Sequence, residues 1–216
     1  MTTSTFSTDC RRCERLATFL DDVKKEHPDY FAKPVPAFGD PDARLLVVGL
    51  APGMHGANKT GRPFTGDYAG VLLYETLHAT GFATRPVSEH ADDGLELPGC
   101  RITNAVKCLP PQNKPVGAEV NNCNSFLADE LNAMQDGSVL LVLGSIAHKA
   151  VIKALGLRQA DYKFGHAAEF ELPDSAGKKL TLLSSYHCSR YNTQTKRLTA
   201  DMFMQVFVRA RELLAE

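Results

Sequence analysis

The chain has 216 residues, of which 44% are hydrophobic and 23% are charged, and its net charge is −1. This length suits one domain, residues 1–216, and the near-neutral charge argues against a strongly basic coat without excluding a basic groove. No apolar run approaches the ~18 residues of a membrane helix. The opening residues also lack the basic and apolar regions of a secretory signal, so we expect a cytoplasmic protein that does not bind membranes.

Periodic apolar residues predict helices that alternate with short apolar strands. The helices are expected at residues 10–27, 68–80, 117–135 and 144–155 and from Thr199 to the end. The strands are expected at residues 43–50, 101–106, 139–143, 166–172 and 179–185, the last two joined by residues 173–177. Turn-rich loops are expected at residues 28–42, 84–99 and 110–115. This alternation predicts an α/β fold around a mostly parallel sheet.

Three polar segments follow predicted strands and are candidate parts of a functional site. They begin after Leu50, around Asn104 and after Ser185. In folds with a parallel sheet, ligands bind at the carboxyl ends of the strands. We therefore expect the chemistry of this protein to lie in these three segments.

Four cysteines suggest a metal site. Cys10 and Cys13 form a Cys-x-x-Cys pair, and Cys108 and Cys123 follow far downstream. Four thiolates can hold a zinc ion or an iron–sulfur cluster, although the second pair is spaced too widely for a common zinc ribbon. The first pair alone could instead be redox-active, and all four could be unrelated buried cysteines.

The glycine-rich stretch GLAPGMHGANKTGRPFTGD, residues 49–67, follows a predicted strand. Part of it has the glycine spacing of a Walker A motif, but Arg62 and Pro63 stand where Lys and Ser or Thr are required. A pocket for a flat polar ring fits better, because glycines let the backbone approach a ligand and Phe64 offers a stacking face. Asp67 could orient a water. The ordinary alternatives are a helix N-cap for Asp67 and core packing for Phe64.

This stretch resembles the first motif of the uracil-DNA glycosylase superfamily, with the GLAP start and TGD end typical of its family 5. ITNAVKCLPPQNKP, residues 102–115, is similar to the segment that carries an asparagine and a cluster cysteine in families 4 and 5. YHCSRYNTQTKRLT, residues 186–199, resembles the last family motif, which usually reads His-Pro-Ser-x-x-Asn. The matches keep the family order, so together they are specific.

The resemblance implies a three-layer α/β/α fold with a central, mostly parallel sheet of four strands. It also implies that the four cysteines named above bind a [4Fe–4S] cluster. The expected function is that of a monomeric DNA glycosylase of base-excision repair, which hydrolyses the bond between uracil and deoxyribose in DNA. Hypoxanthine and xanthine are further expected substrates. The target base must be flipped out of the duplex, which costs least at a mismatch.

The same resemblance implies roles for individual residues. Phe64 would stack on the flipped base, and the amide of Asn104 would hydrogen-bond its Watson–Crick edge. His187 would donate to uracil O2 as negative charge develops there, and Asp67 would position water or stabilise the sugar cation. Without the resemblance, Asn104 would be assigned to an Asx-turn and His187 to the surface. Further contacts to the base would come from Ala51, Pro52 and Gly53.

Basic and polar residues beside the first and last motifs are the expected DNA contacts. Phosphate contacts give salt-dependent affinity without sequence information, and the last motif would also press on the minor groove. A solvated basic face is the alternative for each of these residues. The predicted contacts are Asn58, Lys59, Arg62, Ser189, Arg190, Asn192, Lys196 and Arg197.

Two departures from the family pattern bear on activity. Cys188 stands where proline normally follows the motif histidine, so the loop would be less rigid. The small or apolar residues Ala51, Gly53 and Met54 occupy the region where related families carry a water-activating carboxylate. The missing carboxylate is compatible with a broad range of bases. Cys188 gives weight to the alternative function, an iron–sulfur module that binds nucleic acid or senses redox state without turnover.

Overall fold

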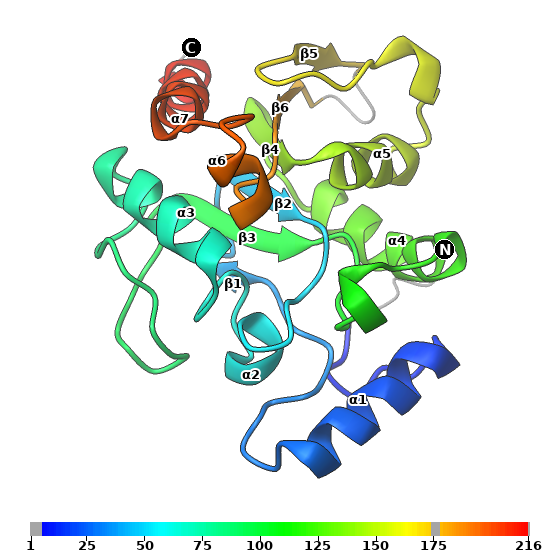
Figure 1. Cartoon of the computed structure of the whole chain (residues 1–216). Helices are drawn as coiled ribbons and strands as arrows, with labels where there is room; N and C mark the ends of the chain where they lie inside the picture. The colour runs from blue at the N-terminus through cyan, green and yellow to red at the C-terminus, as the bar shows by residue number, and fades with distance from the viewer. Residues whose placement is uncertain (1–5, 174–177, 216) are drawn as a thin grey trace.

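The computed structural model describes residues 6–173 and 178–215, which form a six-stranded sheet flanked by helices (Figure 1). The strands lie in the order β1-β3-β2-β4-β6-β5. The four inner strands are mutually parallel, and β1 and β5 each pair antiparallel at an edge. The strands are β1 (Phe38–Gly39), β2 (Leu45–Gly49), β3 (Cys100–Asn104), β4 (Ser138–Leu143), β5 (Glu169–Leu172) and β6 (Leu180–Ser185).

The expected α/β fold around a mostly parallel sheet is confirmed, but the expected count of four strands is corrected to six. The parallel core does have four strands. Each edge gains one more, because β1 pairs with β3 and β5 pairs with β6. A strand of two residues such as β1 is too short to show any periodic pattern. Residues 174–177, in the predicted β5–β6 link, lie outside the described residues.

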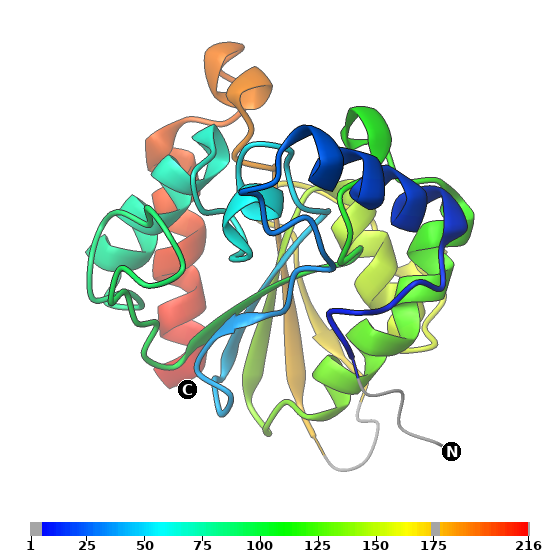
Figure 2. The ribbon, with the colours of Figure 1, turned by 90° about the horizontal axis from the view of Figure 1, so that it is seen from below.

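Helices cover both faces of the sheet because its strand residues alternate between two cores (Figure 2). In β2, Leu45 and Val47 face the core covered by α3 and α7, whereas Leu46 and Val48 face the core covered by α4 and α5. No helix within the described ranges is long and apolar enough to cross a membrane. The helices are α1 (Glu14–Glu26), α2 (Ala57–Thr60), α3 (Tyr68–Ala79), α4 (Gly117–Asn132), α5 (Ser145–Ala154), α6 (Arg190–Gln194) and α7 (Ala200–Ala215), with 3₁₀ turns η1 (Pro111–Asn113) and η2 (Gln159–Asp161).

A third core ties α1 to the segment that follows β3. Leu16 and Leu20 of α1 are buried in one cluster with Leu109 and with Phe126 of α4. The turn after β3 is also held by a buried ion pair. Lys107 donates to both carboxylate oxygens of Glu130, each at 2.9 Å, and its side chain is only 1% exposed. The backbone between β3 and the third core is therefore firmly fixed.

Strand register brings the three polar segments to one edge of the sheet. Gly49 at the end of β2 lies opposite Asn104 at the end of β3. Leu143 at the end of β4 lies opposite Ser185 at the end of β6. The loops that follow these strands therefore start side by side, which is where the sequence predicts a ligand.

Candidate active site

The three polar segments meet in a pocket of about 300 Å³ at the carboxyl edge of the sheet. A larger hollow of about 530 Å³ lies beside β1 and is lined by none of the predicted site residues. Among the predicted base contacts, Pro52 is the exception, because it is buried and does not line the pocket. The pocket lining is Leu50, Ala51, Gly53, Ala57, Phe64, Asp67, Tyr68, Ala69, Asn104, Asn113, His187, Ser189 and Arg190.

Asn104 presents an unpaired acceptor in this pocket. Its side chain is almost fully buried, and Oδ1 has no hydrogen-bond partner among the described residues. A Cβ at Gly49 would lie 2.4 Å from this oxygen and 2.7 Å from the ring of Phe64, so only glycine fits there. A buried acceptor without a partner costs free energy, which a ligand that brings a donor would recover.

Phe64 forms a wall of the pocket in a strained backbone conformation. Its φ of 55° is left-handed, a region that bulky residues rarely adopt. The Tyr74 hydroxyl donates to the Pro63 carbonyl at 2.8 Å, and a Cβ at Gly70 would fall 1.8 Å from the Phe64 carbonyl oxygen. The ring is buried in the core beside α3 and also lines the pocket; core packing is thus observed, and stacking on a base stays a prediction. Backbone strain of this kind is typical of ligand sites.

His187 lines the same pocket, beside Phe64 of the glycine-rich loop. Its ring is inclined by 28° to that of Phe64, with the centroids 5.9 Å apart. Burial lowers the pKa of His187 to about 4, so the imidazole is neutral at pH 7 and carries one N–H donor. Asn192 Nδ2 donates to the His187 carbonyl at 2.8 Å, which holds the backbone of this residue in place.

The neighbouring Cys188 is completely buried and anchors the same loop. Its Sγ donates to the Ala69 carbonyl in the first turn of α3 at 3.4 Å. The segment lacks the proline that would stiffen it, but it is tied at Cys188 to α3 and at Asn192 to its own backbone. Side-chain hydrogen bonds thus replace part of the constraint that a proline ring would give.

Asp67 both caps α3 and faces the pocket. Oδ1 accepts from the Gly70 amide at 2.8 Å, as expected for an N-cap. Oδ2 lies over the glycine-rich loop, where a Cβ at Gly56 would be 2.6 Å away. Burial raises the pKa of Asp67, and the amides of Gly70 and Ala69 oppose that shift. Asp67 therefore caps α3 and also lines the pocket, and its predicted catalytic role stays a prediction.

Ser189 and Arg190 of the last motif line the pocket at the start of α6, which projects from the body of the protein (Figure 2). The Arg190 guanidinium lies 4.9 Å from the ring centroid of Tyr68, and that of Arg197 lies 4.6 Å from the ring centroid of Tyr186. Both cations are thereby held over aromatic faces. Among the predicted DNA contacts, Lys59, Arg190, Lys196 and Arg197 are exposed, and Ser189 and Asn192 are half-buried.

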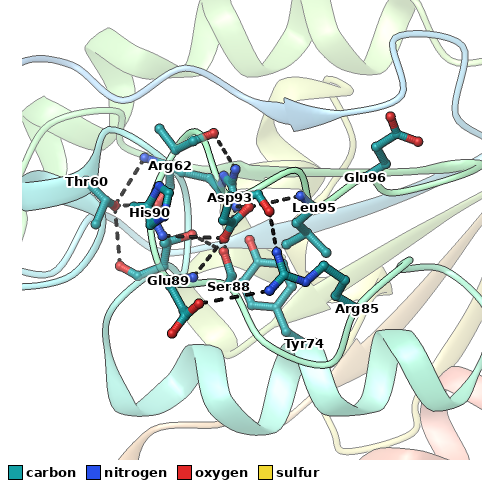
Figure 3. Close-up of polar contacts among 12 residues, drawn as sticks. Thr60, Arg62, Tyr74, Arg85, Ser88, Glu89, His90, Asp93, Leu95 and Glu96 are labelled. Atoms are coloured by element: carbon teal, nitrogen blue, oxygen red, sulfur yellow. Dashed lines mark hydrogen bonds and ion pairs between the residues drawn. The ribbon is translucent and has the colours of Figure 1, made fainter.

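Arg62 does not lie on the surface. Its side chain is 4% exposed and forms a 2.8 Å ion pair with Asp93, whose side chain is 2% exposed (Figure 3). It also donates to Ser88 at 2.9 Å. Asn58 is fully buried. The structure therefore contradicts the predicted phosphate contacts at Asn58 and Arg62, because each side chain is enclosed by protein. Arg62 instead links the turn-rich segment 84–99 to the pocket loop.

The four cysteines of the predicted metal site come from three parts of the chain and meet in the third core. Cys10 and Cys13 precede α1, Cys108 follows β3 and Cys123 lies on α4. Burial raises the pKa of the Cys108 thiol, and the nearby thiols of Cys123, Cys10 and Cys13 raise it further. Asn122 Nδ2 donates to Cys13 Sγ at 3.4 Å. Within the described residues, no group of three or more His, Cys, Asp or Glu side chains is placed to hold a single metal ion.

Two polar residues of the pocket were not predicted. Tyr68 follows Asp67 directly, and its hydroxyl accepts from Thr193 Oγ1 at 3.3 Å. Asn113 lies in the loop after β3 with a left-handed φ of 57°, next to Gln112 with a φ of 56°. Both residues stand inside or beside the quoted motifs. Their positions in or beside the motifs could have indicated them. The left-handed turn that directs Asn113 toward the pocket has no signature in the sequence.

Comparison with known proteins finds relatives that match nearly the whole chain. The family model described as the uracil DNA glycosylase superfamily matches residues 36–211. The type-5 uracil-DNA glycosylase of Thermus thermophilus is 45% identical over 211 residues, which are 95% of this chain and 94% of that protein. The type-5 enzyme of Mycobacterium tuberculosis is 39% identical over 94% of this chain and 78% of its own. The type-4 enzyme of Archaeoglobus fulgidus is 31% identical over 82% of this chain and 75% of its own.

Among solved structures, the chain resembles that of wild-type SMUG2 from Pedobacter heparinus. The TM-score is 0.52 with 16% sequence identity, and the match covers 100% of this chain and 92% of that one. At this identity, the likeness bears on the fold alone.

Proposed function

The chain belongs to the uracil-DNA glycosylase superfamily, and from this premise we propose how its pocket recognises and releases a base. It is a uracil-DNA glycosylase of base-excision repair, a hydrolase of the N-glycosidic bond. The observation that supports the proposed mechanism is the convergence of Asn104, Phe64, Asp67 and His187 on one pocket. These side chains come from the three separate motifs.

Asn104 recognises the Watson–Crick edge of the flipped base. Its unpaired Oδ1 accepts the N3–H of uracil, and its Nδ2 donates to O4. Cytosine presents an acceptor at N3, so it would leave the buried oxygen of Asn104 unpaired and face it with a second acceptor. Phe64 stacks on the face of the base, as a wall of the pocket.

Hypoxanthine and xanthine are proposed as further substrates on the same chemistry. Each carries an N–H beside a carbonyl, the pair of groups that uracil presents to Asn104. The small residues Ala51 and Gly53 line the pocket, so no bulky side chain stands at these two positions to exclude a purine. The side-chain amide of Asn104 that recognises uracil would therefore recognise the deaminated purines as well.

His187 and Asp67 act on the two fragments of the breaking bond. Negative charge develops on the base, and the neutral imidazole of His187 donates its N–H to uracil O2, an interaction that makes cleavage about 10² to 10³ times faster. Positive charge develops on the sugar, and the carboxylate of Asp67 stabilises it or positions the attacking water. Both interactions are stronger in the transition state than with the bound substrate, and this difference lowers the barrier to cleavage.

A [4Fe–4S] cluster fits the four cysteines better than a single ion does. The thiols of Cys123, Cys10 and Cys13 lie close enough to Cys108 to raise its pKa, but within the described residues they are not placed to hold a single ion. Cys10, Cys13, Cys108 and Cys123 would each supply one thiolate to such a cluster. When bound, it would link α1 to α4 and to the segment after β3. Iron and sulfide analysis tests this, and Cys123→Ser should lower both the cluster content and the unfolding temperature.

DNA is the proposed partner, bound by the protein as a monomer. The exposed cations Lys59, Arg190, Lys196 and Arg197 would contact phosphates around the pocket mouth. Sedimentation of the protein with and without a short duplex tests the monomeric state. The cytoplasmic location expected from the sequence stays a prediction.

Strand cleavage after alkali, on a duplex with one U·G pair, tests the whole proposal. Wild-type protein should cleave, and His187→Ala should cleave far more slowly while binding the duplex as well. The same duplex with hypoxanthine or xanthine then tests the wider substrate range. If cluster-loaded protein cleaves none of the three, the chain is instead an iron–sulfur module that binds DNA without turnover.

A further inference from the structure

Asn113 lines the pocket but has no part in the chemistry above. Its side chain is exposed, and no hydrogen bond joins its amide to another of the described residues. Of the other polar residues that line the pocket, Asp67 caps α3 and Ser189 caps α6. Asn113 therefore presents an amide whose donor and acceptor are both available to a molecule in the pocket.

The turn that carries Asn113 is held in a strained conformation. Asn113 and Gln112 both have a left-handed φ, of 57° and 56°. Asparagine tolerates this region better than most residues do, but two such residues in succession are uncommon. Arg15 of α1 braces the turn, because it donates to the Lys114 carbonyl at 3.3 Å and pairs with Glu119 at 2.7 and 2.8 Å. Strain that is held in this way is typical of ligand sites.

The order of the strands decides which edge of the base Asn113 meets. β3, which ends at Asn104, and β6, which precedes His187, lie on opposite sides of β2 and β4 (Figure 1). The loop that carries Asn113 follows β3, so it reaches the pocket from the side of Asn104. In the proposed mechanism, Asn104 binds the Watson–Crick edge and His187 binds O2. Asn113 therefore meets the edge next to O4 of uracil or O6 of a purine.

This edge differs between uracil and the deaminated purines. In uracil it carries the hydrogens of C5 and C6, which offer no partner to an amide. In hypoxanthine and xanthine it carries N7, which accepts hydrogen bonds as N7 of adenine and guanine does. The Nδ2 group of Asn113 is a donor that matches this acceptor. The contact is thus available to purines alone.

We propose that Asn113 determines the specificity for deaminated purines, and that its Nδ2 donates to N7 of a flipped hypoxanthine or xanthine. This inference rests on the proposed function, because the base must first be flipped into this pocket. It gives uracil and the purines different sets of contacts. Both use Asn104, and only the purines use Asn113.

Binding of duplexes that cannot be cleaved tests this contact without the chemical step. The target nucleotide would carry uracil, hypoxanthine or 7-deazahypoxanthine on a 2′-fluoroarabinose sugar, whose fluorine destabilises positive charge on the sugar and prevents cleavage. Asn113→Gly keeps the left-handed turn and removes the amide. The affinity for hypoxanthine relative to uracil should fall about 2- to 10-fold, as for loss of one neutral hydrogen bond. Wild type should prefer hypoxanthine to 7-deazahypoxanthine by the same factor, and Asn113→Gly should bind these two duplexes equally.

Two further variants separate the amide from the turn. Asn113→Asp also tolerates the left-handed conformation but places carboxylate oxygens opposite N7, so it should disfavour hypoxanthine relative to uracil at least as much. Gln112→Gly is the matched control, because Gln112 has the same backbone conformation and does not line the pocket. It should bind the three duplexes as wild type does. An Asn113→Gly variant that keeps the wild-type ratio of hypoxanthine to uracil binding would overturn the proposal.

Single-turnover excision distinguishes failure of this inference from failure of the proposed function. Asn113→Gly should excise hypoxanthine more slowly relative to uracil than wild type does. Wild-type protein that excises uracil but not hypoxanthine would refute the inference about Asn113 and leave the proposed glycosylase intact. Wild-type protein that excises none of the bases would refute the proposed function itself.

Discussion

Two substitutions of Asp67 separate its capping role from its role in the pocket. Asp67→Asn keeps a good N-cap, because the amide oxygen can accept from the Gly70 amide as Oδ1 does at 2.8 Å. It removes the negative charge. Asp67→Ala removes both the cap and the charge, so the two variants differ only in the helix cap.

The expected magnitudes follow from these two roles. Loss of the cap should cost about 1 kcal/mol, which lowers the unfolding temperature by about 2–4 °C in a domain of this size. A carboxylate about 4 Å from the sugar cation contributes about 4 kcal/mol at an effective dielectric constant of about 20. Both variants should therefore lose up to about 10³-fold in the rate of excision. Only the alanine variant should lose stability.

The assay is single-turnover excision from a U·G duplex, followed as a function of pH. Only the carboxylate form of Asp67 stabilises a cation, so the rate should fall as the pH decreases through its pKa. Because burial raises that pKa, the fall should come above the ordinary value of 3.8. Protonation of His187 near pH 4 would strengthen its donation to O2 and so cannot cause the fall.

Three results would refute this reasoning. If Asp67→Asn excises uracil as fast as wild type, Asp67 is a helix cap and nothing more. If Asp67→Asn and Asp67→Ala unfold at the same temperature, the hydrogen bond to Gly70 contributes nothing to stability. A rate without an acid limb in wild type would also remove the carboxylate from the mechanism.

Arg62→Met leaves Asp93 buried without its partner, so the free energy of unfolding in urea should fall by about 3–5 kcal/mol. The salt dependence of DNA binding should not change; a shallower slope would restore the predicted phosphate contact. His187→Ala should slow single-turnover excision by about 10² to 10³ without weakening duplex binding, and an unchanged rate would show that its N–H is not used. Gly49→Ala should cost about 1–3 kcal/mol in stability and weaken inhibition by free uracil, because the new Cβ meets Asn104 Oδ1; undiminished inhibition would show that the amide does not hold the base.

The features of the site that sequence could predict are local ones. Apolar runs mark β2 and β4, because buried parallel strands are apolar on both faces. The motifs that follow the strands located Asn104 and His187, and the strand register then placed Asn104 beside Gly49. The sequence also indicated both alternatives for Asp67, a helix cap and a functional group in the pocket.

The features that sequence could not show depend on distant partners or on backbone torsions. Arg62 looked like a surface cation, and its partner Asp93 stands 31 residues downstream in a segment that had no assigned role. The left-handed φ of Phe64 leaves no compositional sign, because the residue is not glycine. The short helices α2 and α6, with four and five residues, are below the length at which helical periodicity can be detected.

The glycines near the pocket differ in whether they tolerate a larger residue, which matters for enzyme redesign. A side chain at Gly49 or Gly56 would collide with Asn104 or Asp67, and one at Gly70 with the backbone of Phe64. Gly53 differs, because a Cβ there would meet only Asp67 Oδ2, at an ordinary contact distance of 3.6 Å. An added methyl group at residue 53 would narrow the cavity without rebuilding the loop. Gly53→Ala is thus expected to disfavour the proposed purine substrates more than uracil, because purines are larger.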